Sequence, residues 1–220
     1  MRISHLGHSA VLVEVADRRV LIDPGNFSDA WHGLTDLDAI LVTHQHPDHL
    51  DPEQLPALIR ANPHARIMVE PSIIGLIEDG TLPQLGPADP IHAGEQTAIG
   101  DLLIEAVGGH HAIIHRDIPR IGNVGYVLRS EGQPTFFHPG DSLEVAPGGV
   151  DVLAIPTYGP WAAMKETIDF ARDVGAAHGF PIHDGLLHER GVQLVYGRLG
   201  AMTGMHMHDL RDQEPWTPTA

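Results

Sequence analysis

Four side chains that can bind a metal ion stand close together in the segment HQHPDH at residues 44–49. The segment directly follows the apolar run 38–43, which is typical of a strand buried on both faces. His44 and His46 are two positions apart, so in extended chain they point to the same side. Asp48 and His49 lie one turn later and can face the same hollow from another direction. The spacing offers two ligands to each of two adjacent ions, and therefore predicts further ligands downstream.

Ligand-type residues also follow three later apolar runs, each beside a Gly or Pro turn residue. His110 and His111 come after the run 102–107. Asp141 follows the run 135–137, and His183 follows 178–182. Because α/β folds place their chemistry at the carboxyl ends of strands, we expect these side chains to meet the first segment at one sheet edge.

Composition limits the chemistry and the partners. The chain has no cysteine, so a metal must be held by histidine and carboxylate, and a cytoplasmic location is favoured. The formal net charge of 13 − 29 = −16 argues against nucleic acid as a partner, because phosphate backbones need clustered Lys and Arg. No apolar stretch is long enough to predict a membrane span, so we expect no membrane partner.

The remaining pattern predicts a layered α/β domain over residues 1–204. Strands are expected at 10–15, 18–24, 38–44, 65–71, 95–109, 123–141, 150–156 and 178–182, with hairpin turns at Asp17, Gly100-Asp101 and Glu131-Gly132. Helices are expected at 51–61, 72–80, 161–175 and 188–200. The Pro/Gly-rich stretch 83–90 receives no element, and the tail 205–220 is expected to be mobile.

Taken in order, the motif H-x-H-x-D-H, a later His, a GD[ST] Asp and a P-x-H His resemble the metallo-β-lactamase superfamily of dinuclear metallohydrolases. Within it, HLGHSAVLVE, LIDPG, GDS, PTYGPWAAMKETIDFA and PIHD are similar to the small stand-alone branch related to L-ascorbate-6-phosphate lactonases. The resemblance covers roughly residues 3 to 185. It implies an α/β (α+β) fold, a four-layer αββα sandwich of two mixed sheets with outer helices and the metals at one edge.

The resemblance also implies a ligand set for two divalent ions, zinc first, with manganese or iron as alternatives. The first ion would be held by His44, His46 and His111, the second by Asp48, His49 and His183, with Asp141 bridging both. We prefer His111 to His110 because the third histidine of the superfamily is usually followed by Ala or Ser, here Ala112. Asp23 and Thr43 would support the ligands through hydrogen bonds.

The implied activity is hydrolysis of a small ester, lactone or phosphodiester by a hydroxide between the ions. Asp48 would also be catalytic, by accepting a hydrogen bond from the hydroxide and orienting it. His115, Tyr158 and Trp161 are candidates for the wall of a small-molecule pocket. The alternative is a protein that binds metal without hydrolysis, either a binding or regulatory module or a redox metalloprotein.

Other histidines have no partner in this pattern. His8 in the LGHSA segment is expected either to form a hydrogen bond near the site or to stabilise a turn. We interpret His178 as solvated or hydrogen-bonded, and His206 and His208 as binders of stray metal at most. The exposed loop 112–121 could form an interface between copies in a homo-oligomer.

Overall fold

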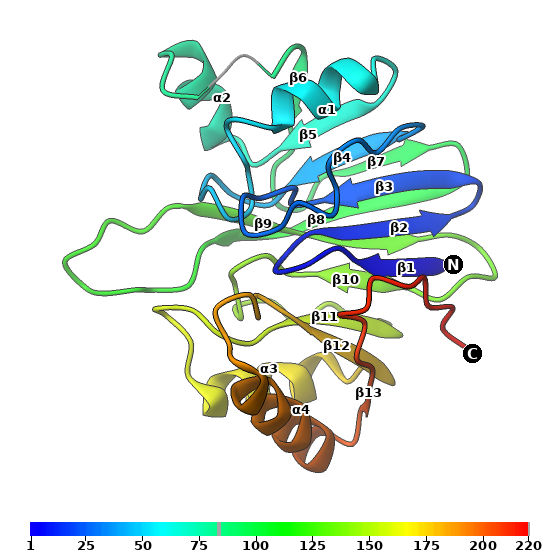
Figure 1. Ribbon diagram of the computed structural model, residues 1–220, viewed down its shortest axis with the longest axis vertical. Helices are drawn as coiled ribbons and strands as arrows, with labels where there is room; N and C mark the ends of the chain where they lie inside the picture. Colours follow the sequence, from blue (N-terminus) through cyan, green and yellow to red (C-terminus); the bar gives the residue numbers. More distant parts are fainter. Residues whose placement is uncertain (83–84, 220) are drawn as a thin grey trace.

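The computed structural model describes residues 1–82 and 85–219, which form two β-sheets stacked face to face (Figure 1). The first sheet has the order β1-β2-β3-β4-β5-β6. Its strands are β1 (Arg2–His5), β2 (Val11–Val15), β3 (Arg18–Ile22), β4 (Ala39–Val42), β5 (Arg66–Val69) and β6 (Ala88–Pro90). The pairs β1/β2 and β2/β3 are antiparallel, and those from β3 to β6 are parallel, so this sheet is mixed.

The second sheet has the order β13-β12-β11-β10-β9-β8-β7 and is also mixed. Its strands are β7 (Gln96–Ile99), β8 (Leu102–His110), β9 (Gly122–Arg129), β10 (Phe136–His138), β11 (Val152–Pro156), β12 (His178–Ile182) and β13 (His206–Met207). The strands β10 to β13 pair in parallel, whereas β7 to β10 pair antiparallel.

Helices cover the outer face of each sheet (Figure 1). Helices α1 (Leu55–Ala61) and α2 (Ser72–Glu78) pack on the first sheet, and α3 (Met164–Val174) and α4 (Glu189–Thr203) pack on the second. The predicted four-layer αββα sandwich is therefore confirmed. No helix in the described ranges is long and apolar enough to cross a membrane.

The alternation of side chains along the strands explains the layers. In β3, Val20 and Ile22 enter the core between the sheets, whereas Leu21 packs beneath the helices on the other face. The same division holds in β11, where Ala154 faces the other sheet and Ile155 faces α3 and α4. Both faces are buried along β11 and along the last three residues of β3, and these stretches are accordingly continuous apolar runs in the sequence.

Strand direction brings the predicted ligand segments to one edge of the sandwich. Strands β3 and β4 are parallel, so the residues after them, Asp23 and Thr43, lie at the same edge of the first sheet. Strands β8, β10 and β12 run in one direction in the second sheet. Strand β9 is antiparallel to both β8 and β10, and the pairs β10/β11 and β11/β12 are parallel. The segments after these strands are those that contain His111, Asp141 and His183.

Two parts of the fold differ from the sequence-based expectation. The Pro/Gly-rich stretch 83–90, of which residues 83 and 84 lie outside the described ranges, contains the edge strand β6, where Pro90 is tolerated. The first predicted helix begins at Leu55 and not at Asp51, because the Asp51 carboxylate accepts the backbone N–H groups of Glu53 and Gln54 in a turn.

The C-terminal segment 205–219 is packed against both sheets and not frayed as expected. Strand β13 pairs with β12, and Leu210 is buried in the core between the sheets. Further along, Trp216 forms a two-bond antiparallel bridge to Ile3 of β1, with both N···O distances 2.8 Å. The segment thus links the edge strand of one sheet to the edge strand of the other. The apolar residues that anchor it are isolated in the sequence, so they gave no periodic signal.

Substitution of Phe180 by Ala tests the core between the sheets. Phe180 is fully buried and stacks on Phe136 with ring centroids 6.3 Å apart. We expect the free energy of unfolding of the metal-free protein to fall by about 3–5 kcal/mol, as for other aromatic truncations that leave a cavity. Urea denaturation measures the change. The control Leu194→Ala, at a side chain 58% exposed on α4, should stay within about 0.5 kcal/mol, and equal losses would contradict this core.

Candidate metal centre

Two groups of ligand-type side chains meet at the shared edge of the sandwich. The first group is His44, His46, His111 and Asp141, and the second is His8, Asp48, His49 and His183. Asp141 lies between them: its carboxylate oxygens are 3.4 Å from His111 Nε2, 3.2 Å from His49 Nε2 and 3.0 Å from His183 Nε2. The structure therefore brings together every residue of the predicted ligand set, with Asp141 in the central position.

A buried carboxylate orients the histidines of the first sheet. Asp23 Oδ2 accepts hydrogen bonds from Thr43 Oγ1 and from His49 Nδ1, each at 2.7 Å. Because the Thr43 hydroxyl proton goes to Asp23, Thr43 Oγ1 accepts the proton of His44 Nδ1 at 3.0 Å. Both imidazoles thus carry hydrogen on Nδ1, which leaves Nε2, directed towards Asp141, as the nitrogen available to a metal ion. Asp23 and Thr43 occupy the supporting positions that the resemblance implies.

Backbone carbonyl groups orient the histidines of the second sheet in the same way. His111 Nδ1 donates to Ala112 O at 2.7 Å, and His183 Nδ1 donates to Tyr158 O. A carbonyl only accepts, so each Nδ1 carries hydrogen and each Nε2 faces the centre. The atoms His111 Nε2, His183 Nε2 and Asp141 Oδ1 are buried without a hydrogen-bond partner. Buried polar atoms are rarely left unpaired, so these three atoms fit a site for a bound metal ion, which would be their missing partner.

The charges at the centre also fit metal ions. Burial raises the pKa of Asp141, but the positive charges of His49 and His183 have a larger effect and hold that pKa well below its usual range. Burial lowers the pKa of His183, but Asp141 and Asp48 outweigh it and raise the pKa to about 9. In the metal-free chain, protonated imidazoles therefore balance the carboxylates. Divalent ions would displace these protons and provide the same positive charge.

The loops at the centre are packed too closely for ordinary side chains. A Cβ atom on Gly25 would lie 1.9 Å from Asp48 O, so the LIDPG and HQHPDH segments fit together only with glycine there. Glycine adopts positive φ angles readily, whereas other residues rarely do. At this centre three residues other than glycine have positive φ angles: His8 (51°), Asp23 (51°) and His183 (56°). Such backbone costs on the order of 1 kcal/mol or more per residue and is concentrated at functional sites.

His8 is the residue whose place at the centre the sequence left undecided. Its Nε2 is 3.1 Å from Asp48 Oδ2, and the Gly185 N–H donates to its Nδ1 at 3.2 Å. Burial lowers the pKa of His8 to about 4, so the ring is neutral and its one proton is on Nε2. His8 therefore donates a hydrogen bond to Asp48. Its lone pair is already used by Gly185, which favours a role in holding Asp48 over a role as a metal ligand.

The predicted pocket residues are placed differently from one another. Trp161 is buried, and its Nε1 donates to Asp141 Oδ2 at 3.0 Å. Tyr158 contributes its backbone carbonyl to His183, while its side chain is 46% exposed. His115 lies outside the cluster on the exposed loop, where its Nδ1 accepts the Asp117 N–H at 3.2 Å. His110, the alternative ligand, points away from the cluster towards Glu144 and is 65% exposed.

A cavity of about 460 Å³ adjoins the centre between the loops of the second sheet. Its lining includes Ala112, Ile113, Arg120, Ser142, Glu144 and Trp161. Arg120 is engaged there, because its Nη2 donates to Glu144 at 2.9 Å and its Nε donates to the His111 carbonyl oxygen at 2.5 Å. Trp161 donates to Asp141 and the Ala112 carbonyl accepts from His111, and both residues line this cavity. A molecule in the cavity would therefore lie against the centre.

Comparison with known proteins places this geometry in a family. A family model described as a β-lactamase superfamily domain matches residues 2–183. The metallo-β-lactamase fold protein YhfI from Bacillus subtilis has the same fold, with a TM-score of 0.76 at 16% identity over 99% of this chain and 98% of that protein. The chain belongs to the metallo-β-lactamase superfamily.

Two superfamily relatives match over nearly their whole length. Protein Rv0786c of Mycobacterium tuberculosis is 42% identical over 205 residues, which cover 92% of this chain and 93% of that protein. A UPF0173 metal-dependent hydrolase of Carboxydothermus hydrogenoformans is 26% identical over 201 residues, 83% of this chain and 84% of that protein. The resemblance inferred from the four sequence motifs is thus confirmed at the level of the superfamily.

Substitution of Asp23 by Asn tests the orienting carboxylate. Asp23 accepts the Thr43 Oγ1 and His49 Nδ1 protons with Oδ2 and the Thr43 backbone N–H with Oδ1. The amide of Asn has only one acceptor oxygen, so its NH2 group would face at least one of these donors. We expect zinc affinity, measured by competition with a chromophoric chelator, to fall about 10–100-fold. The same change at the exposed Asp29 is the control and should leave affinity unaltered. Unchanged affinity in both variants would refute the orienting role.

Paired substitutions distinguish the two adjacent histidines after β8. We expect His111→Ala to lower the zinc content of the purified protein, because its buried Nε2 faces the centre. His110→Ala should retain full metal content, since that side chain is exposed. Elemental analysis of protein prepared without a histidine tag gives the comparison, and the reverse result would exchange the two assignments.

Proposed function

We propose that the chain is a metal-dependent hydrolase with a dinuclear centre. The observation that carries the proposal is the convergence of ligand-type side chains from both sheets around Asp141, where His111 Nε2, His183 Nε2 and Asp141 Oδ1 are buried without a hydrogen-bond partner. In this proposal His44, His46 and His111 hold one ion, Asp48, His49 and His183 hold the other, and Asp141 is shared. All donors are imidazole nitrogen or carboxylate oxygen, which suits zinc and also accommodates manganese or iron. The hydrolase name of the Carboxydothermus hydrogenoformans relative supports the reaction class.

When bound, two adjacent divalent ions supply a nucleophile at neutral pH and polarise the substrate oxygen that accumulates charge. The residues of the chain position the reaction. Asp48 is partly exposed at the centre, where its carboxylate can accept a hydrogen bond from an attacking water and fix its direction. His8 Nε2–H donates a hydrogen bond to that carboxylate, and Trp161 Nε1–H donates one to the carboxylate of Asp141. These bonds fix the orientation of both carboxylates.

The cavity beside the centre favours a small substrate of low charge. Its one arginine, Arg120, already pairs with Glu144. Arg116, the other candidate for a phosphate, is 87% exposed and lies near Asp117. Phosphate recognition generally uses arginine side chains with free donors directed at the ligand. We therefore place small esters and lactones ahead of phosphodiesters as substrates.

Assays on a panel of small lactones, esters, thioesters and phosphodiesters test the function. We expect the zinc-loaded protein to hydrolyse at least one carboxylic substrate. Asp141→Ala should lose most bound metal together with activity, by more than about 100-fold, because its carboxylate contacts ligands of both groups. Asp169→Asn, at an exposed position on α3, is the control and should retain both.

Two results would contradict the proposal. If Asp141→Ala retains two ions per chain, the shared position of Asp141 is wrong. If the wild-type protein binds two ions but turns over no member of the panel with zinc, manganese or iron, the centre serves binding and not hydrolysis.

A further inference from the structure

Three histidines gather at the far end of β12 from the candidate metal centre. His178 is the first residue of β12, whereas His183 directly follows its last residue. A strand rises about 3.3 Å per residue, so the two places, five residues apart, are separated by roughly 16 Å. His206 of β13 pairs in register with His178, and His208 lies two residues further along. Adjacent strands in register place these three side chains on one face.

The ring nitrogens of two of these histidines are already at the separation of metal ligands. His178 Nδ1 and His208 Nε2 are 3.1 Å apart. The same distance separates His44 Nε2 from His46 Nδ1 in the candidate metal centre. Two nitrogens bound to one tetrahedral zinc at about 2.0–2.1 Å would be about 3.3 Å apart. The His206 ring is farther away, with its centroid 5.7 Å from that of His178, and rotation of its exposed side chain can bring it closer.

The tautomer of His178 leaves the required lone pair in place. His178 Nε2 lies 3.2 Å from the carbonyl oxygen of Thr219, which can only accept, so Nε2 carries the proton. In the neutral ring, the lone pair is then on Nδ1, towards His208. Burial and the neighbouring His178 and His206 rings lower the pKa of His208. Neutral imidazole is the form that binds metal.

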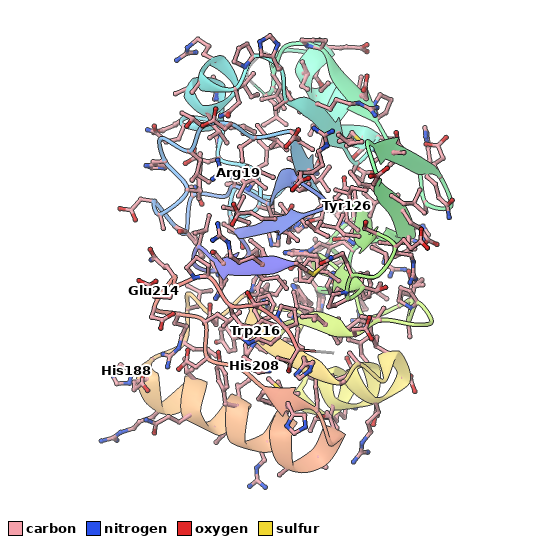
Figure 2. The ribbon with its side chains drawn as sticks, turned by 90° about the vertical axis from the view of Figure 1, so that its right-hand side faces the viewer. Arg19, Tyr126, His188, His208, Glu214 and Trp216 are labelled. Carbon is pink, nitrogen blue, oxygen red and sulfur yellow. The ribbon has the colours of Figure 1, made fainter. Side chains whose placement is uncertain are left out.

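The surroundings of the three histidines connect them to the C-terminal segment. The His208 ring stacks on Trp216 with centroids 4.0 Å apart, and Figure 2 shows the two side chains together. Trp216 in turn bridges to Ile3 of the other sheet. A cavity of about 270 Å³ opens beside His178 and is lined also by Asp151, Pro218 and Thr219. Water molecules in this cavity could complete the coordination of an ion.

We propose that His178, His206 and His208 bind one divalent transition-metal ion, distinct from the candidate metal centre, and that this ion fastens the segment 205–219 to β12. A site made of imidazole nitrogens selects zinc, nickel or copper over magnesium, calcium or manganese. The ion would join residues of β12 to residues of the C-terminal segment, so its binding free energy would oppose detachment of that segment.

Metal titration of the full chain, first saturated with zinc at the candidate centre, tests the site. We expect wild-type protein to bind one additional zinc or nickel ion per chain. His178→Gln and His208→Gln should abolish this additional binding, and His206→Gln should weaken it at least about tenfold, because a ligand is lost in each. His188→Gln, at an exposed histidine at the start of α4 (Figure 2), is the matched control and should bind like wild type.

Hydrogen exchange gives a second readout that does not depend on hydrolysis. The amides of His206, His208 and Trp216 donate to backbone carbonyl groups of neighbouring segments. Adding the additional ion should slow their exchange in wild type and in His188→Gln but not in His208→Gln. Activity should be the same in all of these variants, because the site is remote from the candidate centre.

The outcomes separate the alternatives. No additional ion in wild type would mean that His178 and His208 share only an N–H···N hydrogen bond, and would overturn the proposal. Unchanged binding in any one of the three histidine variants would overturn the three-histidine site. Additional binding without slower exchange in the segment 205–219 would overturn its fastening role.

Discussion

The arrangement of the centre depends on one buried charge, the carboxylate of Asp23. It is fully buried, and it receives hydrogen bonds from the Thr43 amide, the Thr43 hydroxyl and His49. Through these bonds it fixes both the end of β4 and the direction of the imidazoles that follow. A buried carboxylate is tolerated only when its oxygens are satisfied, so the network that compensates Asp23 is the same one that orients the ligands.

The other half of the centre lies on a different sheet, and direct bonds between the sheets set the position of the two halves. Tyr126 of β9 donates its hydroxyl proton to Val42 O at 2.9 Å, and Val124 N–H donates to Thr43 O at 2.9 Å (Tyr126 is labelled in Figure 2). Both bonds end on the last residues before His44. The spacing between ligands is therefore determined by the core between the sheets as much as by the loops that carry the ligands.

Sequence patterns were sufficient for the parts of the fold in which one residue type repeats or follows a strand. The buried strands β4 and β11 are continuous apolar runs, and the ligands stand directly after strands, so both were predictable. The position of the C-terminal segment was not, because Leu210 and Trp216 are isolated apolar residues whose partners lie far away in the chain. His8 was undecided for the same reason: its role depends on the Gly185 N–H, which only the folded chain brings to its ring.

The bridge between Trp216 and Ile3 also affects how copies of the chain meet. An edge strand with free N–H and C=O groups is a template for pairing with another molecule. On β1, Trp216 occupies both backbone groups of Ile3. At the far edge of the same sheet, β6 ends in Pro90, and in the second sheet the edge strand β13 spans only two residues. These features disfavour pairing with another copy through β1, β6 or β13, so association of this acidic chain through an open strand would be limited to the edge strand β7.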